Sequence, residues 1–185
     1  MDFYAHTISP YDDFMLNDLE KLEDILSSGY LLSRRYLNLN KEDSLFNGMD
    51  YISLCDLSKR HDDYSSYYLY TTRGLSLLFD KNIDVIIPNY IILNDRHLST
   101  IQKMHELGLK GRYSDLRDEV QVKDKLSLEY LKGASIPLSN IQKNHSDDYV
   151  KYYLYFIKSM LSYYKFDVPI YNLDNNKKLD KMIKM

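Results

Sequence analysis

The segment GRYSDLRDEVQVKD (111–124) contains a carboxylate pair, Asp118-Glu119, that follows a basic, turn-rich stretch. The next residues alternate between apolar and polar types, which predicts a strand. Neighbouring side chains of a strand point to opposite faces, so we expect Glu119 to share a face with Gln121 and Asp118 to turn back toward the loop. Two interpretations are open. The pair belongs either to a solvated turn entering an edge strand, or to a catalytic site in which a strand holds a carboxylate beside a substrate loop.

Two other polar positions interrupt apolar, strand-like segments. His6-Thr7 lies within 3–8, and Ser53 lies within MDYISLCDL (49–57). A lone histidine on a strand is most often a structural residue. Strand residues far apart in sequence rarely meet by chance, however, so convergence of His6, Ser53 and Glu119 on one cleft would indicate a site.

The elements that must position these residues follow from the period of the apolar side chains. Helix 14–28 is expected to end at Gly29, and Ser146 is expected to cap the helix 146–164. A weaker helix is expected at 97–107, a closing strand or loop after residue 127, and a short helix at 174–185. The expected strands are 3–8, 49–55, 74–79, 83–93 and 119–123.

This order of elements predicts an α+β fold rather than a doubly wound α/β sheet, because one early helix is followed by several strands separated by loops. The length of 185 residues fits one domain. We expect a core formed by residues 1–140 and a helical extension, 141–185, that packs on the same domain.

The composition limits the possible partners and location. The net charge of -3 gives no global basic field for nucleic acid, and Cys55 is the single cysteine, which excludes an internal disulfide. The histidines have no metal-ligand spacing, so no metal site is expected. No segment reaches the roughly 18 consecutive apolar residues of a membrane span, and no signal peptide is evident. Together these features predict a cytoplasmic protein that does not insert into membranes.

Four motifs occur in an order that resembles a known family. They are His6-Thr7 on the first strand, the helix and its exit DLEKLEDILSSGYLLS (18–33), the aromatic-x-Ser strand Tyr51-Ile52-Ser53, and the acidic strand Asp118 to Val122. Together they resemble the ADP-ribosyltransferase fold, and within it the DarT-type and related minimal enzymes. The resemblance covers residues 3 to about 138 and implies a split sheet with flanking helices.

The resemblance implies that NAD is the substrate and that the bond between nicotinamide and ribose is broken. Glu119 would stabilise the oxocarbenium-like transition state, as carboxylates do in glycosidic chemistry, and Ser53 would brace Glu119. His6 and Thr7 would hold and orient the ligand. The other implied cofactor-binding residues are Ser33, Arg34, Tyr51, Tyr68 and Arg73, and the implied acceptor loop contains Arg112, Tyr113 and Arg117.

The sequence does not identify the acceptor of ADP-ribose. Protein-modifying relatives often carry Gln or Glu two residues before the catalytic Glu, whereas this chain has Arg117 there. The acceptor is therefore a protein or a nucleic acid, and simple NAD hydrolysis is a further possibility. A toxin or effector role, with an antitoxin or host target as partner, fits the small size. The alternative from another class is a non-catalytic binding or inhibitor protein on a degenerate transferase fold.

Overall fold

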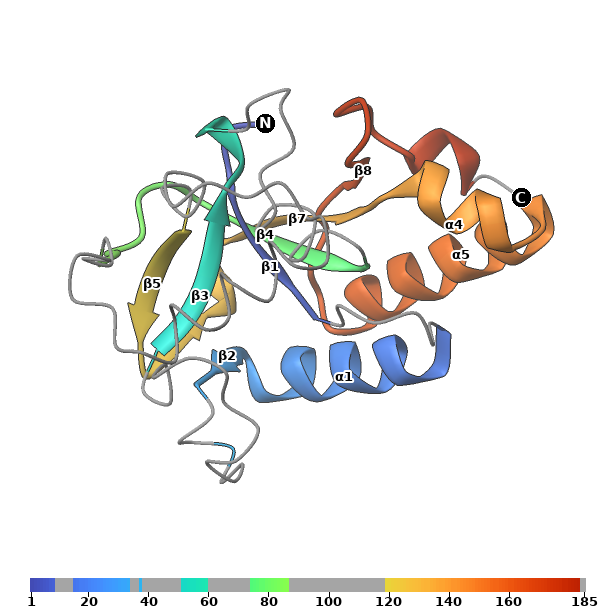
Figure 1. Ribbon diagram of the computed structural model, residues 1–185. Coiled ribbons are helices and arrows are strands. Elements are labelled where there is room, and N and C mark those ends of the chain that lie inside the picture. Colours follow the sequence, from blue (N-terminus) through green and yellow to red (C-terminus); the bar gives the residue numbers. More distant parts are fainter. Residues whose placement is uncertain (9–14, 34–36, 38–50, 60–73, 87–118, 184–185) are drawn as a thin grey trace, which may run out of the picture.

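A six-stranded, mostly antiparallel sheet organises the chain (Figure 1). The computed structural model describes residues 1–8, 15–33, 37, 51–59, 74–86 and 119–183. The strand order is β5-β3-β1-β4-β7-β8, and only the β7–β8 pair is parallel. The strands of this sheet are β1 (Tyr4–Thr7), β3 (Tyr51–Asp56), β4 (Ser76–Phe79), β5 (Glu119–Lys123), β7 (Leu131–Ile136) and β8 (Ile170–Asn172).

A second, two-stranded sheet pairs β2 (Tyr30–Leu32) with β6 (Lys125–Ser127). β6 follows β5 almost at once, through a turn in which Asp124 has a positive φ of 63°. That tight turn carries the chain from the edge of the large sheet into the small one.

Three α-helices are described, α1 (Met15–Ser28), α4 (Leu138–Asn144) and α5 (Asp147–Tyr163). Short 3-10 turns occur at Leu57–Lys59, Leu128–Tyr130 and Asp180–Met182.

The predicted helix ends are confirmed for α1 and α5. Gly29 has φ +73°, which glycine adopts without strain, and the hydroxyl of Ser146 accepts a hydrogen bond from the Tyr149 amide at 3.3 Å.

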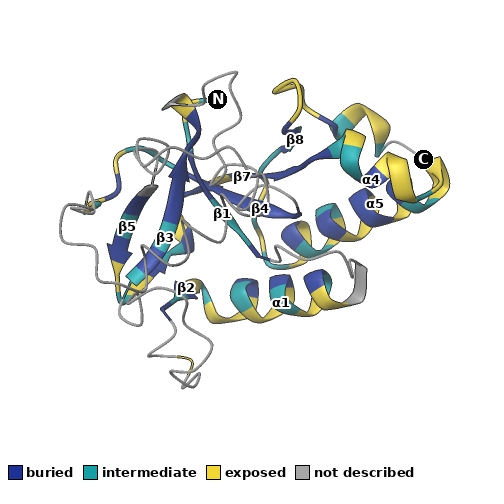
Figure 2. Ribbon diagram, viewed as in Figure 1, coloured by how far each residue is buried: buried dark blue, intermediate teal, exposed yellow. Residues whose placement is uncertain are grey.

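The main core lies between one face of the large sheet and the helices α1 and α5 (Figure 2). Leu54 and Leu77 contribute from the sheet, Leu22 from α1 and Leu154 from α5, and all four are almost completely buried. Because side chains alternate along a strand, the other face carries Ala5, Cys55 and Leu78, which form a smaller cluster with Leu57 and Leu173. Cys55 is therefore a buried core residue.

The α+β prediction is confirmed, and the strands 3–8, 49–55, 74–79 and 119–123 coincide with β1, β3, β4 and β5 to within two residues wherever they are described. Of the expected strand 83–93, the residues beyond Ile86 lie outside the described part, as does the expected helix 97–107. Ile86 itself bridges to Gln121 on the edge of β5 that faces away from β3.

The C-terminal region is less helical than expected. Within 141–185, residues Ile170–Asn172 form β8, an edge strand of the large sheet, and the expected helix at 174–185 is reduced to the 3-10 turn Asp180–Met182. The region packs on the rest of the chain, because the buried Tyr153 hydroxyl of α5 donates to the buried Asp18 carboxylate of α1 at 2.9 Å.

Candidate functional site

The three strands that carry the sequence motifs are neighbours in the sheet. β1 holds His6 and Thr7, β3 holds Tyr51 and Ser53, and β5 begins at Glu119. The order β5-β3-β1 brings them side by side although long segments separate them in sequence (Figure 1). The fold therefore gathers the predicted motifs on three adjacent strands.

A hydrogen bond links the first two motifs directly. The Nδ1–H of His6 donates to the main-chain carbonyl oxygen of Ser53 at 2.9 Å. Since a carbonyl can only accept, Nδ1 must carry the proton. Burial lowers the pKa of the His6 imidazole and outweighs the opposite effect of the Ser53 carbonyl. The ring is thus neutral at physiological pH, with Nδ1 as donor and Nε2 as acceptor.

This hydrogen bond occurs where β1 and β3 stop pairing. In the described chain the paired residues of these two strands are Tyr4 with Asp56 and Ala5 with Cys55. Beyond them, β3 stays paired with β5 down to Tyr51, and β1 stays paired with β4 up to Thr7. The His6 side chain therefore supplies a donor to a β3 carbonyl just past the last backbone pair.

The predicted site residues divide between the two faces of the sheet. His6 is paired with Leu77, a residue of the main core, so its position is on the face covered by the helices. Thr7 is on the opposite face, and Ser53, two residues from Cys55, has the parity of that same opposite face. His6 and Ser53 are thus joined through a backbone carbonyl and not through two converging side chains.

Thr7 has a partner that the sequence did not indicate. Its Oγ1 lies 3.0 Å from the Oγ of Ser76 on β4, and Thr7 and Ser76 are directly opposite in register. Ser76 is in turn opposite Ser135 of β7, and both serines are fully buried. The signal that could have identified Ser76 is a single polar residue in the otherwise apolar run GLSLLF (74–79).

Ser33 and Tyr51 approach the same turn. The Ser33 amide donates to the carbonyl of Asp124 at 2.8 Å, and Tyr51 pairs with Lys123. The Ser33 side chain is buried, and its Oγ has no hydrogen-bond partner within the described residues. The two predicted cofactor-binding residues are therefore close through the β5–β6 turn.

For Glu119 the structure describes the backbone position only. It is the first residue of β5 and is opposite Cys55 of β3, two positions along from the Ser53–Gln121 pair. As the partner of Cys55, this position is on the same face as Ser53 and on the face opposite His6, so the expected convergence of His6, Ser53 and Glu119 on one face is wrong. The Glu119 side chain is outside the described part of the structure, so bracing by Ser53 stays a prediction.

Several predicted site residues lie outside the described residues altogether. They are Arg34, Tyr68, Arg73, Arg112, Tyr113, Arg117 and Asp118.

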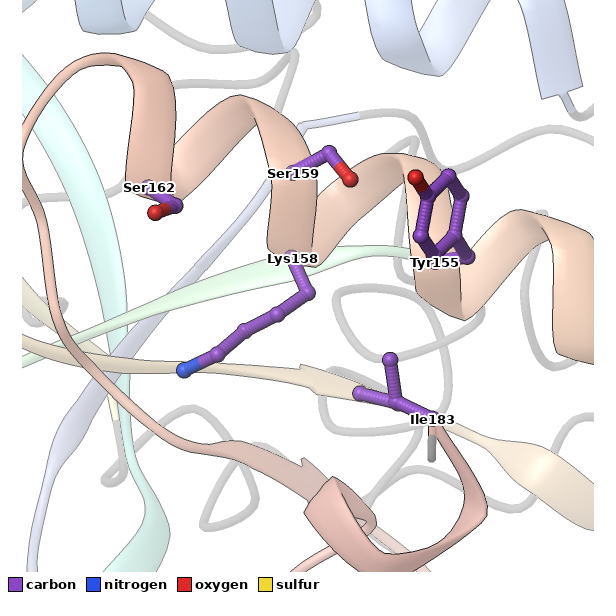
Figure 3. Close-up of a pocket in the computed structure, with 5 residues that line it drawn as sticks. All are labelled: Tyr155, Lys158, Ser159, Ser162 and Ile183. Atoms are coloured by element: carbon purple, nitrogen blue, oxygen red, sulfur yellow. The ribbon is translucent and has the colours of Figure 1, made fainter. Parts of the chain in front are cut away.

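A surface pocket on α5 is separate from the motif strands. Figure 3 shows Tyr155, Lys158, Ser159 and Ser162 of α5 around it, together with Ile183. The Lys158 ammonium donates to the carbonyl of Val168 at 2.9 Å and lies within 3.7 Å of Asp167 and Asp180 carboxylates. Its charge is already paired, so this pocket offers no cation for a phosphate among the described residues.

Two properties of the described ranges bear on partners. No group of three or more His, Cys, Asp or Glu side chains there could hold a metal ion. No described helix is long and apolar enough to cross a membrane.

Comparisons with known proteins give no further assignment, because no family model, curated protein or solved structure matches this chain.

Proposed function

We propose that this protein is an NAD-dependent ADP-ribosyltransferase that transfers ADP-ribose from NAD to a protein or nucleic acid. The observation that carries the proposal is the adjacency of the motif strands β1, β3 and β5, joined by the hydrogen bond from His6 to the Ser53 carbonyl. The finer fold assignment, a split sheet of the ADP-ribosyltransferase type, is part of the proposal. It is supported by the short β1–β3 pairing and by the separate β2–β6 sheet.

The proposal places NAD where β1 and β3 part. Where two strands diverge, groups that the ladder no longer pairs need other partners, as the Ser53 carbonyl does in accepting from His6, and a ligand can supply such partners. The neutral His6 ring, held through Nδ1, would present Nε2 as an acceptor for a ribose hydroxyl on the helix-covered face. Thr7 and the strand positions of Ser53 and Glu119 belong to the opposite face, so NAD would have to reach both faces where β1 and β3 separate. Ser33 and Tyr51, whose backbones contact Asp124 and Lys123 at the β5–β6 turn, would also contribute.

Glu119 would supply the chemistry. Departure of nicotinamide leaves positive charge on the ribose, and a carboxylate near the 2′-hydroxyl stabilises that charge more in the transition state than in the ground state. Its position at the start of β5 is next to the β3 segment that holds Ser53. Nicotinamide would depart with the electron pair of the broken C–N bond, and a water or a macromolecular nucleophile would bond to the anomeric carbon and lose a proton to solvent.

The test is binding followed by turnover with the full chain. Titration calorimetry with NAD should give a saturable heat, and nicotinamide should be released on longer incubation. Mass spectrometry of added protein and nucleic-acid acceptors should then show the mass of ADP-ribose on one of them. Nicotinamide release without any modified acceptor would reassign the activity as NAD hydrolysis. Absence of both NAD binding and release would refute the proposal.

A non-catalytic binding protein is the second candidate, and one observation favours it. The outer face of α5 exposes Tyr152, Tyr155, Phe156 and Tyr163, with 40% to 79% of each side chain accessible. Exposed aromatic side chains on one helix face are typical of protein interfaces. If NAD does not bind, a macromolecular partner at this face becomes the better assignment, and alanine substitutions at Tyr152 and Phe156 should then abolish its capture.

A further inference from the structure

We propose that Ser76 is a positioning residue for ligand binding, acting by holding the hydroxyl of Thr7. This inference rests on the proposed NAD site and adds a residue from β4, a strand outside the sequence motifs. The hydrogen bond between Thr7 Oγ1 and Ser76 Oγ is 3.0 Å long and joins residues that are opposite in register.

The burial of the two hydroxyls differs in a way that suits this role. Ser76 is 0% exposed, whereas Thr7 is only partly buried. Ser76 can therefore contact an incoming ligand only through Thr7. A Thr hydroxyl has one donor hydrogen and two acceptor positions, so Thr7 keeps hydrogen-bonding capacity after the bond to Ser76 is made. Fixing its rotamer in advance removes part of the entropy that ligand binding would otherwise cost.

Ser135, on the neighbouring strand β7, provides an internal control. It is opposite Ser76, is equally buried at 0%, and its Oγ has no hydrogen-bond partner among the described residues. Replacing Ser135 with alanine removes a buried hydroxyl of the same size without touching Thr7. If burial of a serine were all that mattered, Ser76→Ala and Ser135→Ala would behave alike.

The experiment is a double-mutant cycle on NAD affinity, measured by titration calorimetry with the full chain. Loss of one neutral hydrogen bond corresponds to a change of about fivefold in affinity, and loss of the ligand contact itself to about tenfold. We therefore expect Ser76→Ala to weaken NAD binding about fivefold, Thr7→Val about tenfold, and Ser135→Ala by less than about twofold. In the Thr7→Val background, Ser76→Ala should have almost no further effect, because the residue through which it acts is gone.

Two results would overturn the inference. One is additivity, in which Ser76→Ala weakens NAD binding equally in the wild-type and Thr7→Val backgrounds. The other is an equal loss of NAD affinity in Ser76→Ala and Ser135→Ala. Wild type that does not bind NAD would refute the proposed function and this inference together, whereas wild-type binding with an additive cycle refutes this inference alone. Should Ser76→Ala not fold, Ser76→Cys fills the site with a slightly larger side chain and replaces the hydroxyl by a weak hydrogen-bonding group, and the same coupling with Thr7→Val is expected.

Discussion

The imidazole of His6 and the main-chain carbonyl of Ser53 are hydrogen bonded at 2.9 Å, just past the last backbone pair of β1 and β3. The contact joins two sequence motifs that lie 47 residues apart. It also satisfies a carbonyl next to the point where the two strands separate, and it fixes which imidazole nitrogen carries the proton. His6 consequently has a structural role through Nδ1 and, in the proposed site, a ligand role through Nε2.

These two roles of His6 can be separated by substitution. Asparagine can place its amide nitrogen near the position of Nδ1 but has nothing at the position of Nε2. We expect His6→Ala to lower the free energy of unfolding by about 1–3 kcal/mol, because the Ser53 carbonyl loses its donor. His6→Asn should retain most of that stability while weakening NAD binding. Urea unfolding measures the first effect and calorimetry the second. Equal destabilisation by both substitutions would contradict the assigned hydrogen bond.

The lowered pKa of His6 predicts a pH dependence of stability. The unfolded histidine takes up a proton near its ordinary pKa of 6.5, whereas burial disfavours the charged ring in the folded protein. The unfolded state therefore binds more protons as the pH falls below about 6.5, and the free energy of unfolding should decrease from that point. Comparison of urea midpoints at pH 7.5 and 5.5 should show a smaller loss for His6→Asn than for wild type. Identical pH profiles would show that His6 does not titrate in this way.

The Tyr153–Asp18 hydrogen bond should contribute to the packing of α5 on α1. Both residues are buried, and the Tyr153 hydroxyl donates to the carboxylate at 2.9 Å. Tyr153→Phe removes that donor from a buried carboxylate, so we expect a loss of about 1–3 kcal/mol in the free energy of unfolding. Tyr152→Phe is the matched control, because Tyr152 is the neighbouring residue and is 59% exposed. If both changes cost the same, the buried hydrogen bond contributes nothing specific.

Lys81 should stabilise the fold through Asp56. Burial by itself would raise the pKa of Asp56, but hydrogen bonds from Lys81 and Ser58 hold that pKa below its ordinary value. Lys81 also lies over the Tyr4 ring, 4.3 Å from its centroid. Lys81→Met should therefore lower the free energy of unfolding by about 2 kcal/mol at neutral pH.

The effect of Lys81→Met should shrink as the pH falls through the folded pKa of Asp56, because the protonated carboxyl no longer needs a cation. Lys132→Met is the control, since Lys132 pairs with Asp80 at 3.2 Å while remaining 46% exposed, and exposed pairs contribute little. A Lys81 variant that is no less stable than the Lys132 variant would refute this role.

The sequence predicted the elements whose period is clear and whose ends carry a capping residue. The apolar spacing of α5, the Ser146 cap and the Gly29 end of α1 are local signals, and each is present in the structure. β8 was missed because Ile170–Asn172 is only three residues long and becomes a strand through its pairing with β7. A strand of that length has no period of its own to detect.

The same distinction between local sequence signals and long-range strand pairing applies to the candidate site. The motif residues of β1, β3 and β5 could be selected from residue type and order, but the partners of their side chains depend on register. No pattern in the sequence indicates that Thr7 is opposite Ser76, or that the His6 ring meets a backbone carbonyl rather than the Ser53 hydroxyl. Such contacts are set by strand pairing across long sequence separations.

The most direct test of the central proposal is nicotinamide release from NAD by wild type, Glu119→Gln and Asp118→Asn, each first checked for folding. Glutamine keeps the shape of Glu119 and removes the charge that would stabilise the oxocarbenium-like state. We expect wild type to release nicotinamide, Glu119→Gln to be slower by about a hundredfold while still binding NAD, and Asp118→Asn to stay near wild type. Release by Glu119→Gln at the wild-type rate, or no release by wild type, would contradict the proposal.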